Sequence, residues 1–470
     1  MMQQFINRDE ELNILEERFI SKKTEFIVMY GRRRVGKTEL AVHFIRDKPG
    51  IYFLAGEKAD AENLEEMKGV MADFLKNDEF RMIKFENWVQ LFKSFSEKIR
   101  ERTVIIMDEF PYLVKENKSV PSEFQKIWDM HLSKNDKIML IIVGSSVGMM
   151  EKLLGSKSPL FGRRTAQLEI KPVSIFQVRK FLPGYSMEDC ITTYGCTDGI
   201  PLYLNQFDPK ISAFENIKNN FFRKDALLYG ESDFLLRQEF REPANYFAIL
   251  KAISFGYVKQ NEIVSYTNID KSIISKYLQN LEEIRVITRE FPVTEKKEKR
   301  KNNRYVFSDN YFRFWFRFVY PNRMLIEKRD DGAFASMKKT NNMYLGAVFE
   351  KVASEFLWET KPFRLTRLGR WWHKDKEIDL VALNENENEI YFIECKWMGL
   401  SETRIRKLFS ELKEKSQFVD WNKDAKKHYV IIAKKAENKK IHKKEGNYLF
   451  DMEDMIKLTT HGDVKKGGGD

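Results

Sequence analysis

The N-terminal fold is decided by the stretch Phe26-Ile27-Val28-Met29-Tyr30-Gly31-Arg32-Arg33-Arg34-Val35-Gly36-Lys37-Thr38, which a helical pattern follows. An apolar run, a glycine-bounded loop and a helix in this order predict a strand that feeds a phosphate-binding loop. The two glycines let backbone N–H groups close around a phosphate at the helix N-terminus, where the helix dipole favours anions. Lys37 is placed to reach the β- and γ-phosphates, and the Thr38 hydroxyl to bind Mg²⁺. Residues 31–38 are therefore predicted to bind ATP.

Apolar runs at Ile51–Leu54, Thr103–Met107 and Ile138–Val143 alternate with helical patterns. This alternation predicts an α/β domain with a largely parallel sheet. The run at 103–107 ends in two carboxylates, Asp108 and Glu109. We expect Asp108 to hold Mg²⁺ and Glu109 to polarise the attacking water.

Two further loops of this region carry candidate residues. Ser145 follows the fourth apolar run in Gly144-Ser145-Ser146 and is a candidate sensor of the γ-phosphate, although the same residues also suit an ordinary loop. Phe161-Gly162-Arg163-Arg164 offers Arg163 and Arg164 as cations for the transition state, or equally as exposed charges at a helix start. Phe5-Ile6-Asn7-Arg8 precedes the first strand and is a candidate cover for the adenine.

The composition bounds the class of protein. At 470 residues the chain has room for about three domains. Its net charge of +11 favours an anionic partner, with nucleic acid as the leading candidate. The three cysteines, Cys190, Cys196 and Cys395, form no metal or disulfide pattern and suit a reduced cytoplasm. No apolar run reaches membrane-spanning length, because the longest aromatic run, 311–320, is short and contains arginines.

The middle of the chain is mostly helical from 165 to 240, with a break at Gly199-Ile200-Pro201. From 245 to 308, three helical segments precede two β-like runs that the charged stretch 295–303 separates, an order that predicts a winged helix. Its second helix, Lys271–Glu282, places Lys271 and Lys276 opposite an apolar face that includes Ile273. Such a surface suits DNA, and the alternative is a structural link between nucleotide state and an effector.

Near the C-terminus, an apolar run with Asp379 precedes a second run that ends in Glu394-Cys395-Lys396. Because strand residues two apart share a face, Glu394 and Lys396 point together, and a hairpin with its turn at 384–388 brings Asp379 against them. Two carboxylates so placed can hold a Mg²⁺ that activates water, with Lys396 assisting. Glu350 is a candidate third metal ligand. The alternative is that these are surface acids at strand ends, with Lys396 as their salt-bridge partner.

The motifs of residues 1–310 resemble the archaeal-type ATPases of the AAA+-related STAND branch of P-loop NTPases. The resemblance rests on Tyr-Gly-Arg-Arg-Arg-Val-Gly-Lys-Thr, Met-Asp-Glu-Phe, Gly-Ser-Ser, Phe-Gly-Arg-Arg and Gly-Ile-Pro-Leu-Tyr-Leu. It implies that Pro201 lies near the nucleotide in a GxP element. The typical form of that element has two glycines, whereas this sequence has Asp198-Gly199, a minor departure.

The tail from 310 to 460 resembles the PD-(D/E)xK, or restriction-endonuclease-like, superfamily. More narrowly, Gly-Arg-Trp-Trp, Glu-Ile-Asp-Leu-Val and Ile-Glu-Cys-Lys-Trp are similar to a C-terminal domain of unknown function that accompanies archaeal-type ATPases. The resemblance implies that Glu350, Asp379, Glu394 and Lys396 occupy the active positions of the superfamily.

Together these observations predict an α/β multidomain protein. We expect a P-loop core at 1–165, a helical lid at 166–243, a winged helix at 244–309, a nuclease-like α/β domain at 310–460 and a tail at 461–470. The predicted function is a cytoplasmic, ATP- and Mg²⁺-dependent switch that controls a DNA nuclease in defence or genome maintenance. The alternative is an ATP-regulated DNA-binding or scaffolding protein with a silent nuclease fold. RNA as a target and a homo-oligomeric state both stay open.

Overall fold

The computed structural model describes residues 6, 8–295, 302–439 and 447–466. The chain divides into two compact units, which are described separately. The first unit comprises Met1–Val173 together with Ile200–Leu202, and the second comprises Ser174–Gly199 and Tyr203–Asp470. The predicted lid, winged-helix, nuclease-like and tail segments therefore fall within the second unit, apart from residues 166–173 and Ile200–Leu202 of the predicted lid.

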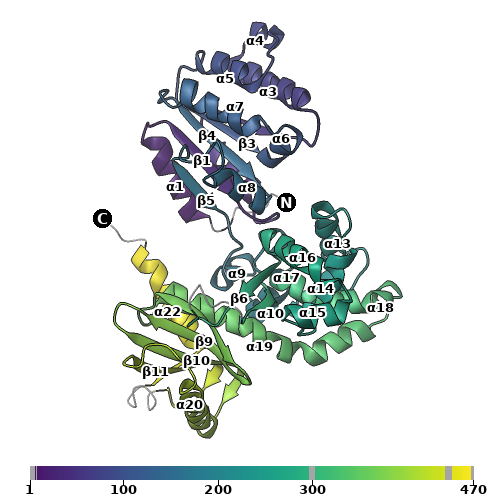
Figure 1. The fold of residues 1–470 in the computed structure, drawn as a ribbon, viewed down its shortest axis with the longest axis vertical. Coiled ribbons are helices and arrows are strands. Elements are labelled where there is room, and N and C mark those ends of the chain that lie inside the picture. Colours follow the sequence, from purple (N-terminus) through teal and green to yellow (C-terminus); the bar gives the residue numbers. More distant parts are fainter. Residues whose placement is uncertain (1–5, 7, 296–301, 440–446, 467–470) are drawn as a thin grey trace. The chain divides into compact units, whose positions relative to one another are not determined.

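The first unit is built on a five-stranded parallel sheet in the order β2-β3-β4-β1-β5 (Figure 1). Its strands are β1 (Glu25–Tyr30), β2 (Gly50–Leu54), β3 (Thr103–Asp108), β4 (Ile138–Gly144) and β5 (Ala166–Glu169). This confirms the parallel sheet and the four strands that the apolar runs predict. The sequence does not predict β5, because its four residues include a glutamine and a glutamate and form no apolar run.

Helices cover both faces of this sheet because alternate strand residues point to opposite sides. Ile27 and Met29 of β1 pack with α1 (Asp9–Ile20) and α2 (Lys37–Ile45). Phe26 and Val28 belong to the core on the opposite face, where several helices supply buried apolar residues. These helices are α3 (Asp60–Leu75), α4 (Asp78–Met82), α5 (Trp88–Ser96), α6 (Phe110–Glu116), α7 (Val120–Ile127), η1 (Trp128–Leu132) and α8 (Val147–Leu154).

The second unit begins with helices and continues with a helix–helix–helix–hairpin segment. The first helices are α9 (Ile175–Phe181), α10 (Met187–Thr197), α12 (Ala213–Phe221) and α13 (Leu227–Glu239), while α11 (Pro201–Leu204) spans the boundary between the units. The segment consists of α14 (Ala244–Ser254), α15 (Gln260–Thr267), α16 (Lys271–Glu283) and the antiparallel strands β6 (Ile287–Glu290) and β7 (Arg304–Phe307). The element order matches the prediction, and the charged turn at 296–301 lies outside the described residues.

Helix α16 has a narrower apolar face than the sequence indicates. Ile274, Leu278 and Leu281 are buried, whereas Ile273 is 45% exposed. The assignment of Ile273 to the buried face is therefore wrong, because the adjacent Ile274 takes the core-facing position of that helical turn. Lys271 and Lys276 are exposed, as predicted.

The aromatic run at 311–320 lies in the core of the second unit. It forms α17 (Asn310–Phe314), the π-helical turn η3 (Trp315–Val319) and the start of η4 (Tyr320–Asn322), which α18 (Arg323–Glu327) follows. The Tyr311 hydroxyl donates to the Leu228 carbonyl over 3.0 Å, and the Trp315 indole N–H donates to the Tyr229 carbonyl over 2.8 Å. Both rings are fully buried, so this run anchors the helices of the unit.

The long helix α19 (Gly332–Thr360) leads into a mixed five-stranded sheet in the order β12-β11-β10-β9-β8. Its elements are β8 (Arg367–His373), β9 (Lys376–Asn384), β10 (Glu389–Leu400), α20 (Glu402–Ser416), β11 (Lys426–Ala436), β12 (Tyr448–Asp451) and α22 (Met452–Lys466). Strands β8, β9 and β10 are antiparallel neighbours, and β10, β11 and β12 run parallel. The predicted hairpin is confirmed, whereas the sequence predicts neither β8, which precedes it, nor β12. Helix α22 runs to Lys466, past the predicted start of the tail at 461.

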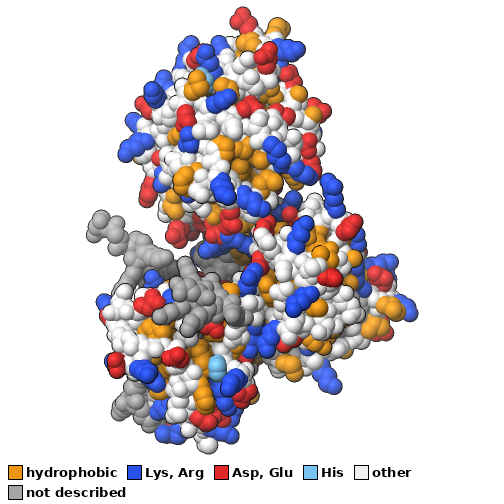
Figure 2. Space-filling view, in the orientation of Figure 1, with side chains coloured by type: hydrophobic (Ala, Val, Ile, Leu, Met, Phe, Trp, Pro, Cys, Tyr) orange, Lys and Arg blue, Asp and Glu red, His pale blue; other side chains and the backbone are white. Residues whose placement is uncertain are grey.

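Positive and negative side chains are interspersed over the face that Figure 2 shows, with hydrophobic side chains between them. Within the described residues, no helix is both long enough and apolar enough to cross a membrane. The thiols of Cys190, Cys196 and Cys395 are free and buried.

Candidate functional site

The loop between β1 and α2 depends on two glycines. A Cβ atom on Gly31 would lie 2.1 Å from the carbonyl oxygen of Ile170, so only glycine allows this close approach of two backbone segments. Gly36, with φ of +91°, has the left-handed conformation directly before the first residue of α2. The loop therefore places its backbone at the N-terminus of a helix, as the sequence predicts, with the geometry of an anion site.

Lys37, the first residue of α2, is buried beside this loop. Its side chain is 5% exposed, and its Nζ donates to the Arg32 carbonyl over 2.8 Å. Burial lowers the pKa of Lys37 to about 8, although the carboxylates of Glu109 and Asp108 act in the opposite direction. A buried ammonium group held by a neutral carbonyl gains stability when a phosphate arrives, because the phosphate supplies the missing negative charge.

Asp108, at the end of β3, gathers donors from three elements. Its Oδ2 accepts from the Thr38 hydroxyl over 2.7 Å and from the Tyr52 hydroxyl over 2.8 Å, and its Oδ1 accepts from the Glu109 N–H over 2.8 Å. Burial and the neighbouring Asp108 carboxylate raise the pKa of Tyr52. Thr38 and Asp108 thus place a hydroxyl and a carboxylate beside the loop, a pair of hard oxygen ligands that fits Mg²⁺. The sequence does not predict Tyr52, whose only signal is a hydroxyl on strand β2.

Glu109 and Ser145 come together from neighbouring strands. The Ser145 hydroxyl donates to the Glu109 carboxylate. Glu109 has a φ of +50°, outside the strand conformation, at the point where α6 begins. The two side chains meet because the parallel strands β3 and β4 end at the same edge of the sheet. The roles of Glu109 in polarising water and of Ser145 in sensing the γ-phosphate stay predictions.

Arg8 holds the loop from the other side, a role that the sequence does not predict. Its Nη2 donates to the Val35 carbonyl and to the Lys171 carbonyl, each over 2.8 Å, and its Nη1 pairs with Glu11 over 2.9 Å. The expected adenine cover falls partly outside the described residues, since Phe5 and Asn7 are not described. Arg8 itself is bound to loop carbonyls and acts as a support for the phosphate loop.

Replacing Arg8 with methionine should loosen this loop without altering any predicted phosphate ligand. Loss of charge-assisted hydrogen bonds from a buried guanidinium should lower the free energy of unfolding of the first unit by about 2 kcal/mol and weaken ATP binding by about tenfold. Urea unfolding and ATP titration calorimetry measure the two effects. Arg46→Met on the exposed end of α2 is the matched control, and equal ATP affinity of both variants would contradict the assigned role.

The remaining predicted residues of this unit have other partners or positions. Arg163 forms an ion pair with Asp129, with Nη2–Oδ2 of 2.8 Å, and Arg164 donates to the Leu154 carbonyl over 3.3 Å. Pro201 begins α11 and belongs by its contacts to the first unit. The catalytic role of either arginine and the position of Pro201 near the nucleotide stay predictions.

In the second unit, the hairpin brings Asp379 of β9 to Glu394 and Lys396 of β10. Lys396 Nζ lies 2.7 Å from Glu394 Oε1 and 3.5 Å from Asp379 Oδ2, and Asp379 Oδ2 also accepts from the Cys395 N–H over 2.8 Å. Burial and the Glu394 carboxylate raise the pKa of Asp379, which Lys396 opposes. Lys415 of α20 also donates to Glu394, over 3.1 Å, a partner that the sequence does not predict.

Glu350 of α19 is held by an arginine. Arg370 of β8 places its Nη2 2.9 Å from Glu350 Oε2 and 2.9 Å from Glu377 Oε1. Burial raises the pKa of Glu350 to about 7, with Arg370 acting in the opposite direction and Asp379 reinforcing the rise.

The donor set of this acidic site only partly fits a metal ion. Across the described residues, no three His, Cys, Asp or Glu side chains are gathered in a metal-holding group. Asp379 and Glu394 are hard oxygen donors, but Lys396 and Lys415 neutralise Glu394 here. The predicted trio of Glu350, Asp379 and Glu394 stays a prediction as a metal site, and the structure brings together its last two members with Lys396.

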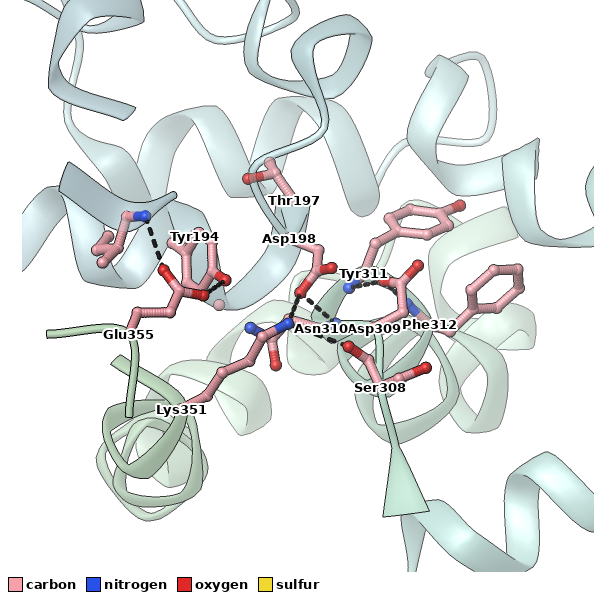
Figure 3. A network of polar contacts seen from close by, with 12 residues as sticks. Tyr194, Thr197, Asp198, Ser308, Asp309, Asn310, Tyr311, Phe312, Lys351 and Glu355 are labelled. Carbon is pink, nitrogen blue, oxygen red and sulfur yellow. Dashed lines mark hydrogen bonds and ion pairs between the residues drawn. The ribbon is translucent and has the colours of Figure 1, made fainter. Parts of the chain in front are cut away.

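A polar network links the end of α10 to α19 inside the second unit (Figure 3). Asp198 Oδ1 lies 2.6 Å from Lys351 Nζ and accepts from the Asn310 N–H over 2.9 Å, and Lys351 also donates to the Ser308 carbonyl over 3.0 Å. Asp198 is 4% exposed and has a φ of +55°, the left-handed region that favours glycine. A second contact of the same two helices joins the Tyr194 hydroxyl to Glu355. The departure at Asp198 is therefore not minor, because its carboxylate anchors α19.

Two family models match the chain. A model described as an ATPase domain predominantly from Archaea matches residues 5–207, and a model described as Archaea bacterial proteins of unknown function matches residues 315–408. An uncharacterised protein of Methanocaldococcus jannaschii is 42% identical over 460 residues, which cover 96% of this chain and 100% of that protein.

Two solved structures are similar to parts of this chain. A Walker-type ATPase of Pyrococcus abyssi is 22% identical, with a TM-score of 0.48, over 67% of this chain and 97% of that one. The ORC2 protein of Aeropyrum pernix is 11% identical, with a TM-score of 0.45, over 70% of this chain and 97% of that one.

Proposed function

This chain belongs to the archaeal-type ATPase family, and we propose that its ATPase cycle switches a Mg²⁺-dependent, nuclease-like site in its C-terminal part. The observation that supports this proposal is that one chain carries both sets of residues. The first unit presents Lys37, Thr38 and Asp108 around a phosphate loop, and in the second unit Lys396 contacts both Asp379 and Glu394. The simplest function for this arrangement is that ATP binding and hydrolysis at the first site control the activity of the second.

In the ATPase site, the residues present suit Mg²⁺-ATP. Thr38 and Asp108 would hold the ion, and Lys37 would leave the Arg32 carbonyl for the phosphates. When bound, Mg²⁺ would neutralise charge on the phosphate oxygens. Glu109, which accepts a hydrogen bond from Ser145, would orient the attacking water.

In the C-terminal site, Asp379 and Glu394 would hold the divalent ion, and Glu350 is a candidate third ligand. The ion would lower the pKa of a bound water and polarise a phosphodiester. Lys396, already between the two carboxylates, is placed to stabilise the charge that develops on the phosphate. The segment 244–309 is proposed as a winged helix, whose exposed Lys271 and Lys276 would contact DNA phosphates.

The nucleotide state would reach the C-terminal site through the Asp198–Lys351 ion pair. Asp198 precedes Gly199-Ile200-Pro201, the element expected near the nucleotide, and Lys351 is the neighbour of Glu350 on α19. A movement of the 199–201 segment would displace Asp198, and through the Asp198–Lys351 ion pair it would shift the helix that carries Glu350. Defence or genome maintenance is the proposed setting for such a gated nuclease.

Lys351→Met should uncouple the two sites while leaving each intact. We expect the ATP turnover rate to stay within about twofold of wild type, whereas the response of the C-terminal site to ATP falls by about tenfold, because an ion pair of low exposure is worth roughly 1–3 kcal/mol. The measurement is the ratio of DNA cleavage rates with and without ATP. Lys339→Met, exposed on the same helix, is the control. An unchanged ratio in Lys351→Met would contradict the proposed route.

One observation favours a second candidate function. Glu394 is bound by both Lys396 and Lys415, so the acidic site is charge-neutralised by the chain itself. In that case the protein is an ATP-regulated DNA-binding protein with a silent nuclease fold. It predicts salt-dependent DNA binding that survives Asp379→Ala and is lost on Lys271→Ala with Lys276→Ala, with no cleavage under Mg²⁺ or Mn²⁺.

A further inference from the structure

The second unit contains a cavity of about 440 Å³ that none of the predicted phosphate or metal ligands lines, although its Arg370 pairs with Glu350. Its walls come from the turn after α14, strands β6 and β7, the aromatic run, helix α19 and the β8–β9 hairpin. A cavity of this size falls within the range that small organic ligands occupy. All of its lining residues belong to the second unit, so the cavity is separate from the phosphate loop.

The lining of this cavity carries a surplus of positive charge. Its charged side chains are Arg304, Arg313, Arg317, Arg370, Glu290 and Glu377. Four guanidinium groups thus face two carboxyl groups. Burial also raises the pKa of Glu290, which weakens the negative contribution of that side chain. The electrostatic balance therefore favours an anionic ligand.

Two of these arginines, Arg304 and Arg370, are held in place by ion pairs with glutamates. Arg370 bridges Glu350 and Glu377, and Arg304 pairs with Glu377 over 3.0 Å. The Arg304 guanidinium also lies 4.4 Å from the centre of the Trp372 ring. The Nε of Arg304 and that of Arg370 are buried and have no hydrogen-bond acceptor in the described part of the chain. These contacts orient the wall of the cavity before any ligand arrives, which lowers the cost of binding.

The other two arginines are not committed to a carboxylate. Arg317 donates to the Ser254 carbonyl over 3.3 Å and lies 5.1 Å from the centre of the Phe255 ring. Within the described residues, the side chain of Arg313 forms no hydrogen bond or ion pair, although its positive charge acts to lower the pKa of the buried Glu290 and Glu350 carboxyl groups. Arg317 follows Arg313 by four residues along the aromatic run, so the two side chains project from the same side of this run. Planar guanidinium groups placed in this way recognise phosphate oxygens.

Aromatic rings complete the lining. Phe255, Phe307, Phe318 and Tyr344 all border the cavity. Such rings stack on nucleobases, and arginines beside them bind the attached phosphate. We propose that this cavity binds a nucleotide 5′-phosphate, with the phosphate on Arg313 and Arg317 and the base against the aromatic rings. The ligand is either a free nucleotide or the phosphorylated end of a nucleic-acid strand, which share this chemistry.

The test uses the full chain with Lys37→Met, which removes nucleotide binding at the phosphate loop. Titration calorimetry measures the affinity of 5′-AMP and of a 5′-phosphorylated single-stranded trinucleotide. Adding Arg313→Gln and Arg317→Gln should weaken binding of the preferred probe by at least about tenfold, since two charge-assisted contacts are lost. Arg241→Gln, an exposed arginine of the same unit, is the matched control and should change affinity by less than about twofold.

The two probes distinguish the sources of the ligand. Binding of 5′-AMP identifies a free nucleotide, and binding of the trinucleotide alone identifies a strand end. The same trinucleotide without its 5′-phosphate should bind at least about tenfold more weakly. Because neither Arg313 nor Arg317 forms an ion pair within the described residues, their replacement should preserve the fold, which circular dichroism checks. Arg317→Lys should retain part of the affinity. Equal affinity in the double glutamine variant and the control, or no binding of either probe, would overturn the proposal.

Discussion

Lys37→Met abolishes ATP turnover, with kcat/KM falling by at least about a hundredfold, because the ammonium group of Lys37 is the positive charge expected on the β- and γ-phosphates. In the wild-type structure, the Lys37 Nζ donates to the Arg32 carbonyl of the loop, 2.8 Å away. Lys37 is the only lysine among residues 31–38, so no other lysine of the loop can replace it. ATP affinity falls with turnover, which calorimetry measures. Lys23→Met, an exposed lysine before β1, is the control. Wild-type ATP affinity in Lys37→Met would contradict the assigned loop.

The same substitution should stabilise the nucleotide-free protein. The pKa of Lys37 falls from 10.5 to about 8 on folding, so the charged form is disfavoured in the folded state. The resulting destabilisation is fully present below pH 8 and is relieved as the pH rises from 8 towards 10.5. After the lost hydrogen bond is subtracted, we expect Lys37→Met to raise the free energy of unfolding at pH 7 by about 2 kcal/mol. Urea unfolding of the first unit at pH 7 and pH 10 measures the gain, which should shrink at the higher pH.

Lys396→Ala should produce the second large effect, at the C-terminal site. Its ammonium group lies between Glu394 and Asp379, and without it two low-exposure carboxylates face each other with Lys415 as the remaining described partner of Glu394. We expect Mg²⁺-dependent DNA cleavage to fall by at least about a hundredfold, because the charge that assists the phosphate is lost. We also expect a loss of about 3 kcal/mol in stability, since an ion pair is broken from one side.

The cleavage effect must be separated from the stability effect. Lys396→Arg keeps the charge and should retain the fold, although a guanidinium group does not reproduce the position of the ammonium nitrogen. Lys427→Ala, an exposed lysine on β11, is the control for general loss of DNA contact. Cleavage by Lys396→Ala at the wild-type rate, on plasmid and linear DNA, would show that the acidic site is not the catalytic one.

Much of the nucleotide site is predictable because it is local in sequence. The strand, the loop and the helix are consecutive. The close approach of Asp108 to Thr38 follows because β1 and β3 end at the same edge of the parallel sheet, with β4 between them. The contacts of Glu394 with Lys396 and of Asp379 with both follow in the same way from strand alternation and one hairpin. Short-range periodicity carries this information directly.

Residues that act over long sequence distances are not predictable in this way. Arg8 reaches Lys171, and Lys415 reaches Glu394 from a separate helix. Nothing in the pattern around Arg8 or Lys415 distinguishes either from a solvated surface charge. Strand β8 is missed because Gly369-Arg370-Trp371-Trp372 does not alternate apolar and polar residues, and its arginine turns out to hold Glu350.

The role of Asp198, a departure from the family pattern, can be recognised only from the structure. The left-handed backbone at this position explains why glycine is typical there. An aspartate at this position adds a carboxylate, and the structure pairs it with Lys351 from 153 residues along the chain. No local sequence signal identifies that partner.

The most direct test of the central claim measures the rate of Mg²⁺-dependent cleavage of linear DNA with and without ATP. The substrates and protein concentrations are the same for wild type, Lys37→Met and Lys396→Ala. The account predicts a rate in wild type that changes by at least about tenfold with ATP, a rate in Lys37→Met that does not respond to ATP, and no cleavage by Lys396→Ala. The account would be contradicted if the wild-type cleavage rate did not change with ATP. It would also be contradicted if a folded, ATP-hydrolysing wild type did not cleave the DNA.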